Sequence, residues 1–579
     1  MAYDWSFSTS AAGQGADKFR ILAFTGEDSV CQGYRFDILL LADVTESDAP
    51  AFLKNMAEAE SHTLRGGTDA TGAFAWSGMP ERVEGMFSAT GGGSVIRALL
   101  RPHSFKLRLG ARSRVFLGAA VPALLQYLLV QEGFTTDTDF TTADLRQTYK
   151  ARSASCQYNE SSFNFLLRHL ERVGGYSYIE QNNGKDRLVL ADGAAEVPAL
   201  PGQSDLDWDP TRAMPITVYS FSRSMATGPT SVTLRDYSTE KPGTESKTET
   251  PQPVTIDDVP YAPLRGGGTA NWYGMFNMFG ETNPDAYSAA DAQAQALLMA
   301  QARARSLVSQ SNLIRGESTV AWMRAGYSFT LSQKNYQLLT VRCACNCCQN
   351  DNDRTNVSRA ANLGFTFDLS RAGYYNSFVC HSLELGPFAP ELSAPRPAVN
   401  GLVHATVCSP ASAGGYASLD DKGRYRARFH FPEAVFDANN NPVTDDDAGL
   451  PVPLRAMQTH AGAASGIHFP LLKDAEVLVA FTDGDPDRPV ILGSLPNPAN
   501  PSVVTDANNK ENIVKTPQGH SLIIKDDAGS NRQITLTSAQ GHALLMKDDV
   551  VRREILLSSA DTGNYIRIIE LSETDKQGR

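Results

Sequence analysis

The chain has 579 residues, of which 42% are hydrophobic and 20% are charged, and its formal net charge at pH 7 is −12. The length predicts several domains, about three to five, and the composition is that of a globular protein. An acidic chain without a Lys/Arg-rich block argues against nucleic acid as a partner. The most apolar run, residues 119–130, is shorter than the roughly 20 residues of a membrane-spanning helix.

The first ten residues, MAYDWSFSTS, contain neither the basic nor the apolar region of a secretory signal peptide. We therefore expect the protein to be made and to fold in the cytoplasm. Any later export would then depend on another machine.

Eight cysteines are present, and four of them fall in the run CACNCC, Cys343 to Cys348. In a cytosolic chain of this size, reduced thiols are expected rather than a disulfide framework. The spacing differs from the C-x₂₋₄-C pairs of zinc sites, and strand alternation places Cys343, Cys345 and Cys347 on one face. We interpret the run as structural thiols, and a metal or redox role is the alternative.

Alternating apolar residues predict two strands near the N-terminus, Phe19–Phe24 and Tyr34–Leu40, with a turn at Thr25–Glu27 between them. Another strand is predicted at Ile96–Leu100. Helix propensity and a following glycine predict a helix over Pro122–Gln131.

The stretch Cys156 to Glu171, CQYNESSFNFLLRHLE, combines a strand with a helix. Ser162 is the predicted N-cap. The helix places four apolar side chains on one stripe, so it should pack against a core. His169 is interpreted as a surface or core residue and not as a catalytic one. The four residues of the stripe are Phe163, Leu166, Leu167 and Leu170.

The next segments predict a hairpin over 176–192, a strand at Val232–Tyr237 and a helix over 289–310. Leu392–Pro397 contains too many prolines for a packed ladder, so we place a domain boundary there. Strand follows strand from Val399 to Asn497, which is the length of an OB-like Greek-key barrel. Within it, Gly423–Phe431 alternates cleanly. The alternation places Tyr425, Ala427, Phe429 and Phe431 inside, and Arg424, Arg426 and Arg428 outside, as a solvated or subunit-facing side.

The most informative stretch is EVLVAFTDGDPDRPVILGSLPN, Glu476 to Asn497. It predicts two strands joined by a tight polar turn, because Gly484 tolerates positive φ and Pro486 fixes φ. A hairpin alone explains the turn, but the complete string is more specific. Its signature positions are Gly484, Asp485, Pro486, Asp487, Arg488, Pro489, Gly493 and Asn497.

The last 61 residues repeat with a 22-residue step, since Gly519-His520 recurs as Gly541-His542 and Gly563 follows. Each unit contains two short strands, which are too thin to enclose a core within one chain. Strands from three chains would bury them along a common axis. The predicted needle-core positions are Leu522, Ile524, Ile534, Leu536, Leu544, Met546, Ile555, Leu557, Ile566 and Ile568.

Together these motifs resemble the VgrG family, the trimeric spike proteins of type VI secretion systems. The likeness is strongest at 156–171 and 476–497, and weaker at Ser113–Phe116 and Val232–Tyr237. The chain departs from the family pattern at Ser162, where Asp is usual, at Phe431 and His460, where Trp is usual, and at Asp474, where Gly is common.

The resemblance implies a mainly β fold with an α+β base, built like a phage tail hub fused to the tail-lysozyme scaffold. Its parts are hub-like β-barrel domains with helical insertions, an OB-fold barrel and a C-terminal trimeric β-helix or β-prism. The implied boundaries are a base of two β-barrel subdomains over 1–391, a linker over 392–398, the OB-fold domain over 399–497, a connector over 498–518 and an intertwined β-helix needle over 519–579. The connector leaves no room for a lysozyme domain, and we expect the needle to be incomplete at its C-terminus.

The resemblance also implies a function and partners. The homotrimer would sit on a hexameric inner tube protein among baseplate proteins and carry a PAAR-type tip protein or an effector. It would penetrate the target membrane mechanically and would be secreted by the type VI apparatus. The nearest alternative is the hub-spike of a phage tail or of an extracellular contractile particle.

No nucleophile elbow, zincin, phosphate-loop or dinucleotide motif is found, so we expect no catalytic, cofactor-binding or metal residues. The carboxylate pairs Asp526-Asp527 and Asp548-Asp549 resemble those of a glycosidase, which leaves a β-helical polysaccharide hydrolase as a weaker alternative. Their repetition at turns favours solvation and trimer register.

Overall fold

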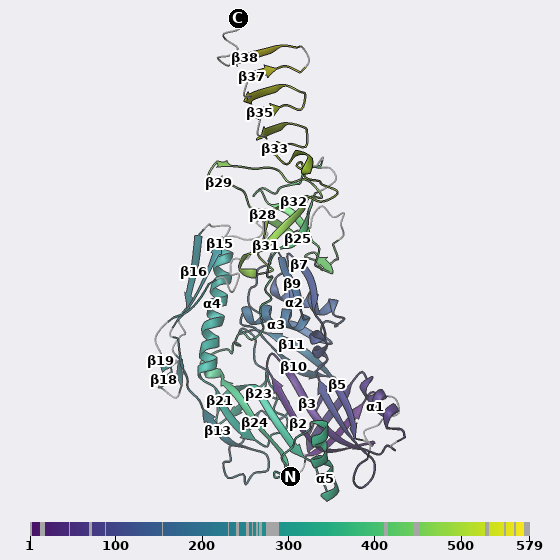
Figure 1. The fold of residues 1–579 in the computed structure, drawn as a ribbon. Coiled ribbons are helices and arrows are strands. Elements are labelled where there is room, and N and C mark those ends of the chain that lie inside the picture. Colours follow the sequence, from purple (N-terminus) through teal and green to yellow (C-terminus); the bar gives the residue numbers. More distant parts are fainter. Residues whose placement is uncertain are drawn as a thin grey trace.

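The structure is a computed structural model, elongated and mainly β (Figure 1). A broad base holds the N-terminus, a barrel follows, and a ladder of strands extends from the barrel towards the C-terminus. None of the helices in the described part of the chain is both long and apolar enough to cross a membrane. The structure describes residues 3–11, 18–45, 47–68, 72–86, 88–152, 154–229, 231–238, 243–249, 254–256, 259–261, 264–265, 269–273, 289–409, 415–443, 452–526, 532–548, 552–560 and 563–571.

A 12-stranded sheet is the frame of the base, with the main order β1-β4-β5-β6-β3-β2-β23-β24-β21-β13, while β22 pairs with β23 and β12. Because β2 pairs with both β3 and β23, the strands of residues 4–101 and those of residues 205–382 belong to one sheet. Its strands are β1 Asp4–Thr9, β2 Phe19–Ser29, β3 Gly33–Ala42, β4 His62–Thr68, β5 Gly72–Met86, β6 Ser94–Arg101, β12 Asp205–Leu206, β13 Val218–Arg223, β21 Ile314–Ser318, β22 Ser328–Leu331, β23 Lys334–Asn346 and β24 Gly373–Ser382.

The first turn lies later than predicted. Residues 25–27 belong to β2, and the chain turns at Cys31, whose φ is 67°. A Cβ on Gly26 would lie 2.4 Å from the Phe36 ring, so glycine is needed here for close strand packing and not for a turn. Gly26 was therefore misinterpreted as a turn residue, whereas it is a strand residue that allows close packing.

Helices and smaller sheets cover the base. The helices are α1 Ala49–Ala57, α2 Val121–Gln131, α3 Ser162–Arg172, α4 Ala289–Ser311 and α5 Asp351–Arg359. The 3₁₀ turns are η2 His103–Arg108, η4 Ala360–Leu363, η5 Leu383–Leu385, η7 Thr482–Gly484 and η8 Asp506–Asn508. The smaller sheets contain β8 Phe140–Asp144, β10 Tyr176–Asn182, β11 Lys185–Ala191, β14 Thr227–Gly228, β15 Ser231–Ser238, β16 Gly243–Glu249, β17 Val254–Ile256, β18 Val259–Tyr261, β19 Leu264–Arg265 and β20 Thr269–Tyr273.

Helix α3 buries the predicted stripe of four apolar residues, and His169 is buried with it. Its N-cap is Ser161 and not Ser162, because the Ser161 hydroxyl accepts a hydrogen bond from the Asn164 amide at 3.1 Å. Ser162 is the first helical residue, and its hydroxyl donates to Glu132 at 2.7 Å.

A three-stranded sheet, β27-β7-β9, joins the barrel segment to the base. It is formed by β7 Arg112–Leu117, β9 Ala154–Glu160 and β27 Ala434–Phe436. Phe436 stacks on Phe116 with ring centroids 5.3 Å apart. The barrel is therefore fixed to the base by main-chain hydrogen bonds as well as by side chains.

The barrel is closed by β25 Val403–Cys408, β26 Tyr425–Phe429, β28 Val452–Ala456, β32 Pro489–Leu495 and β31 Glu476–Phe481. This five-stranded closure confirms the predicted OB-type fold. The alternation in β26 holds for Tyr425, Ala427 and Phe429, which are buried. Arg424 was predicted to lie outside, but it is buried and its Nε lies 2.7 Å from Asp420 Oδ2. A short hairpin, β29 Ala461–Gly462 and β30 Ser465–Gly466, projects from the barrel.

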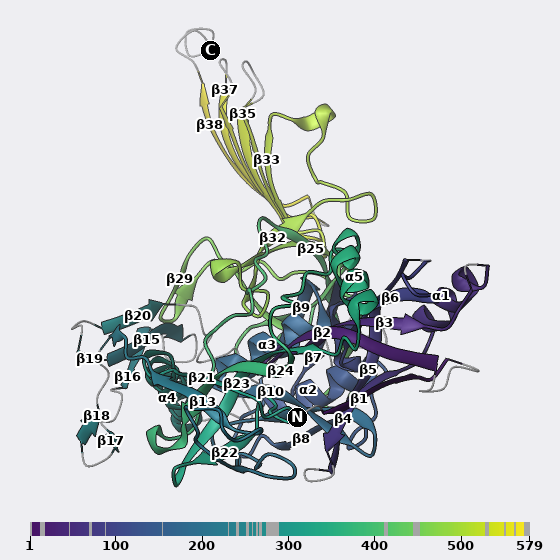
Figure 2. The ribbon, with the colours of Figure 1, turned by 90° about the horizontal axis from the view of Figure 1, so that it is seen from below.

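Six antiparallel strands form the ladder, each hydrogen-bonded to the next along the chain (Figure 2). They are β33 Glu511–Lys515, β34 Ser521–Lys525, β35 Arg532–Thr537, β36 Ala543–Asp548, β37 Arg552–Ser558 and β38 Tyr565–Leu571. Each interior strand of the ladder pairs on both sides with strands of the same chain, and the interleaving of three chains stays a prediction.

Candidate functional site

The ladder presents the ten predicted needle-core residues on a single face. The strand register aligns Leu522, Leu536, Leu544, Leu557 and Ile566 in one column. The other five, Ile524, Ile534, Met546, Ile555 and Ile568, align in the next column. Sequence periodicity therefore located a continuous apolar surface, which we call the needle face.

The needle face is open to solvent in the single chain. Seven of the ten side chains are exposed, from 42% for Ile534 to 65% for Ile566. The opposite face is mixed, since Thr535 and Arg567 stand in its central column. Two ion pairs also lie on this face, Glu511–Lys525 at 2.6 Å and Glu554–Arg567 at 2.5 Å. A contiguous apolar surface of this kind marks an interface in a soluble protein.

The Gly-His repeat has a structural reason that the sequence pattern did not reveal. Gly519 and Gly541 adopt positive φ at equivalent turns. The next residue then reaches the following turn, because Nδ1 of His520 accepts from the Ala539 amide at 3.2 Å and Nδ1 of His542 from the Ala560 amide at 3.3 Å. The histidines thus link successive turns along the needle. Asp526 and Asp548 are exposed, whereas Asp527 and Asp549 lie outside the described residues.

The signature loop, which we define as residues 483–489, connects β31 to β32 and lies against the base. Its polar sequence predicted a tight turn, yet Asp485, Asp487 and Arg488 are 4%, 6% and 7% exposed. The guanidinium of Arg488 lies 3.0 Å from Asp236 Oδ1 on β15 and also donates to the Tyr237 carbonyl. Burial of charged groups is tolerated only where they are paired or hydrogen-bonded.

The two aspartates of the loop hold two further segments. Asp487 Oδ1 accepts from the Cys156 amide on β9 at 2.6 Å, and Asp485 Oδ2 lies 2.5 Å from Arg396 Nη2. Burial, reinforced by the charge of Asp487, raises the pKa of Asp485. The loop therefore ties the barrel to β9, to β15 and to the segment around Arg396.

The predicted linker is part of this junction. Glu171 on α3 accepts from the amides of Ser393 and Ala394 at 2.8 and 3.0 Å. Arg168, also on α3, pairs with Glu160 at 2.8 Å and donates to the Cys156 carbonyl at 2.8 Å. The carboxylates of the junction are engaged in ion pairs and amide hydrogen bonds, so the arrangement fixes segments in place and does not present a reactive pair.

The remaining signature positions shape the hairpin. Gly484 has a φ of 69°, and Pro486 and Pro489 are buried. Gly493 lies opposite Leu478 at a β-bulge in the β31–β32 pairing. Asn497 donates to Glu476 Oε2 at 3.0 Å, which closes the end of the hairpin.

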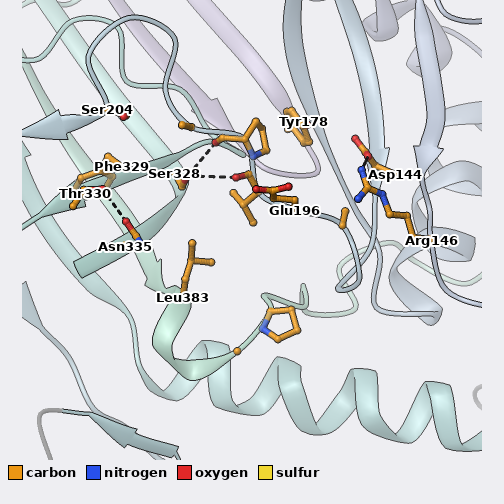
Figure 3. Close-up of a pocket in the computed structure, with 16 residues that line it drawn as sticks. Asp144, Arg146, Tyr178, Glu196, Ser204, Ser328, Phe329, Thr330, Asn335 and Leu383 are labelled. Carbon is orange, nitrogen blue, oxygen red and sulfur yellow. Dashed lines mark hydrogen bonds and ion pairs between the residues drawn. The ribbon is translucent and has the colours of Figure 1, made fainter. Parts of the chain in front are cut away.

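The base also contains an open cavity of about 720 Å³ between β8, β10 and β22 (Figure 3). Its polar walls are tied to one another: Arg146 pairs with Asp144 at 2.8 Å, and Thr330 donates to Asn335 at 2.8 Å. Ser328 donates to the Pro198 carbonyl at 3.1 Å. These contacts brace the walls of the cavity and do not assemble a nucleophile with its base.

Residues 27–342, more than half of the chain, match the family model described as phage tail baseplate hub. The chain belongs to this hub family. Residues 442–495 match a second model, the OB domain of type VI secretion system and phage-baseplate injectors, which coincides with the closing strands of the barrel.

Relatives of this hub-family chain include a protein named as a spike and one named as a toxin. The type VI secretion system spike protein VgrG5 of Pseudomonas aeruginosa is 26% identical over 487 residues, which are 82% of this chain and 56% of that protein. The actin cross-linking toxin VgrG1 of Vibrio cholerae is 25% identical over 559 residues, 91% of this chain and 45% of that protein. The resemblance to VgrG proteins is thereby confirmed, and the chain spans about half the length of the curated relatives it matches.

Solved structures confirm the fold class. The E. coli c3393 protein, a type VI secretion component described as similar to T4 bacteriophage tail proteins gp27 and gp5, has a TM-score of 0.51 at 16% identity, covering 82% of this chain and 97% of that chain. A chain of the Francisella PdpA-VgrG complex has a TM-score of 0.55 at 10% identity, covering 98% of this chain and 88% of that chain.

Sequence reasoning missed the partners of the signature loop. Asp236 lies in the predicted strand Val232–Tyr237 and Arg396 in the predicted linker, but neither pattern indicated a contact with the loop, which is far away in sequence. A weak signal was available: two charged residues, Asp487 and Arg488, stand between two prolines, which fix φ at both ends of the turn. Arg488 and the two aspartates were named as signature residues, but their burial was not foreseen.

Proposed function

We propose that this chain is the trimeric puncturing spike and hub of a type VI secretion system. The observation that carries the proposal is the needle face, an exposed apolar surface on a single-layer sheet at the end of a hub-family chain. Its likeness to spike proteins over most of its length supports the same assignment.

Three copies of the ladder, arranged as a prism with their needle faces inward, would bury the two apolar columns along a common axis. Burial of half-exposed Leu, Ile and Met side chains contributes on the order of 1 kcal/mol each, or on the order of 10 kcal/mol per chain. The main-chain ladder within each sheet is already complete between adjacent strands. Association therefore joins three preformed sheets through side chains.

The junction around the signature loop gives the spike a path for force. A contracting sheath would drive the inner tube, the base would receive the load, and the barrel would transmit it to the needle. The buried pairs Arg488–Asp236 and Asp485–Arg396 and the shared β27-β7-β9 sheet resist separation of barrel and base. A rigid connection at this point is what mechanical penetration requires.

The proposed partners are two further copies of the chain, a hexameric inner tube protein, baseplate proteins and a PAAR-type tip protein or effector at the needle end. The solved complex of a VgrG protein with PdpA in Francisella supports the last of these. The protein would be made in the cytoplasm and secreted by the type VI apparatus. Its role would be structural and not catalytic.

The hub-spike of a phage tail or of an extracellular contractile particle is the second candidate, because the matching family model describes phage tail hubs. Both candidates share the base, barrel and needle. They differ in what is lost when the gene is deleted: secretion of the inner tube protein by the cell, or assembly of released particles.

The proposal is tested in the bacterium that carries the gene. Deletion should abolish release of the inner tube protein into the medium, and the wild-type gene should restore it. A variant with Ile534→Asp and Leu536→Asp on the needle face should not restore release, because six buried carboxylates would face one another in the trimer. Gln533→Asp with Thr537→Asp, on the opposite face of the same strand, is the matched control and should restore it.

Unchanged release after deletion would refute the type VI assignment. Loss of particles without loss of tube-protein release would favour the phage or extracellular alternative.

A further inference from the structure

The cysteine run at the end of β23 holds one pair of thiols in contact. Cys345 Sγ lies 3.2 Å from Cys347 Sγ. The other two cysteines have different partners, since Cys348 Sγ donates to the Leu22 carbonyl at 3.6 Å and Cys343 contacts the Tyr374 hydroxyl. The run is therefore not a symmetrical cluster, and the described residues gather no group of three or more His, Cys, Asp or Glu that could hold a metal ion.

The end of the strand creates this contact. Residues two apart in an extended strand have Cα atoms about 6.6 Å apart, at the upper limit for a disulfide. Here β23 ends at Asn346. The side-chain oxygen of Asn346 accepts from the Cys348 backbone amide at 3.2 Å, and its side-chain nitrogen donates to the Arg371 carbonyl at 2.9 Å. The Cys347 amide donates to the Leu22 carbonyl at 3.0 Å. These bonds turn the chain so that the two side chains on one face converge.

We propose that Cys345 and Cys347 are a redox-active pair that closes to an intramolecular disulfide when the folded protein meets a disulfide oxidant. This site goes beyond the spike function and does not depend on it. The Cys347 thiolate attacks the oxidant disulfide, forms a mixed disulfide and releases one thiol. The Cys345 sulfur then attacks the Cys347 sulfur, and a second thiol leaves. Two cysteine thiols and one disulfide become one cysteine disulfide and two thiols.

The order of the two steps follows from exposure. Cys347 is partly exposed, whereas Cys345 is 2% exposed within the main core. The hydrogen bond with Cys347, together with burial, raises the pKa of Cys345 and so disfavours its thiolate. Because Cys347 is the more exposed of the two, it attacks the oxidant, and Cys345 then attacks the mixed disulfide.

Closure would act locally. The bridge would fix the end of β23 to the segment leading into α5, where Asp353 pairs with Arg20 of β2 through contacts of 2.5 and 2.7 Å. Because only one residue separates the cysteines, the gain from restricting the unfolded chain is small. The expected consequence is a change in thiol state without a large change in stability.

The test uses the full-length folded protein, first reduced and then placed in an excess of oxidised glutathione. Intact mass after maleimide labelling should show that two thiols per chain are lost and that no glutathione is retained. Alkylation before and after reduction, followed by fragmentation of the peptide 343–354, should place both lost thiols at Cys345 and Cys347.

Variants separate this pair from its neighbour. Cys345→Ser should leave a glutathione adduct on Cys347, and Cys347→Ser should leave Cys345 reduced. Cys348→Ser, next in sequence and also partly buried, should close the bridge as the wild type does. The proposal is overturned if wild-type protein keeps all its thiols, if it stops at a glutathione adduct, or if Cys348→Ser abolishes closure. The wild-type result decides even where a variant does not fold.

Discussion

Arg488 carries its charge into the interior at the point where barrel and base meet. Its pair with Asp236 joins residues that are 252 positions apart, and the two side chains are 8% and 1% exposed. A buried pair contributes little compared with well-packed apolar residues, but removal of one partner leaves an uncompensated charge. The value of this pair is therefore that it specifies one arrangement of the two domains.

Arg488→Ala should consequently destabilise the junction by about 3–5 kcal/mol. Loss of hydrogen-exchange protection in β31 and β15 is the measurement, because a multidomain chain does not have a single unfolding free energy. The control is Arg342→Ala, which breaks an exposed 3.2 Å pair with Glu27 and should cost less than about 1 kcal/mol. Arg488→Met combined with Asp236→Leu should restore much of the protection. Equal effects of the two single substitutions would contradict the assignment.

His62 provides a prediction about pH. The ring is buried against Phe7, its Nδ1 lies 2.9 Å from Thr9 Oγ1, and burial lowers its pKa to about 4. The His62 ring therefore stays neutral in the folded protein at pH values where the same ring in the unfolded chain, with a pKa near 6.5, binds a proton. Stability should fall as the pH is lowered from about 6.5 to about 4, by up to about 3 kcal/mol from this residue.

His62→Gln keeps a hydrogen-bonding side chain and removes the titration. As the pH falls across that range, the free energy of unfolding of the variant should rise relative to that of the wild type. Denaturant unfolding, followed by the tryptophan fluorescence of the N-terminal base, measures this difference. A constant difference from pH 7 to pH 4 would show that His62 does not titrate as described.

Strands and helices were predictable where apolar residues repeat at a regular spacing. They were less predictable where tertiary contacts determine the conformation. The needle face follows directly from alternation over five strands, and α3 follows from its apolar stripe. The prediction of a turn at residues 25–27 was wrong, because Gly26 lies within β2 and leaves room for the Phe36 ring of β3. The prediction that Arg424 lies outside was wrong, because Asp420, four residues earlier, pairs with its buried guanidinium. An alternating pattern does not reveal such a partner.

The two faces of β35 should respond differently to added charge. Ile534→Asp with Leu536→Asp should convert the assembly to single chains, because both side chains would be buried between copies. Gln533→Asp with Thr537→Asp should leave the assembly intact. Sedimentation velocity at equal protein concentrations distinguishes the two outcomes, and dissociation of both variants would place the interface elsewhere.

The molecule as a whole combines an apolar surface with no partner in the described chain and a junction in which buried charged groups pair with one another. The OB-type barrel and the mainly β architecture were predictable from strand patterns and from the hub-family motifs. The burial of the signature loop was not, because Asp236, Cys156 and Arg396 come from three distant segments. Their convergence is a property of the fold and not of any local stretch.

The central claim is that the needle face brings three chains together. Light scattering of the full chain and of a version ending at Pro501 tests it most directly. We expect a full-length mass three times the 62.6 kDa of one chain, and a single chain or weak association after truncation. A stable full-length monomer would contradict it, because seven exposed apolar side chains on one face would then have no physical explanation.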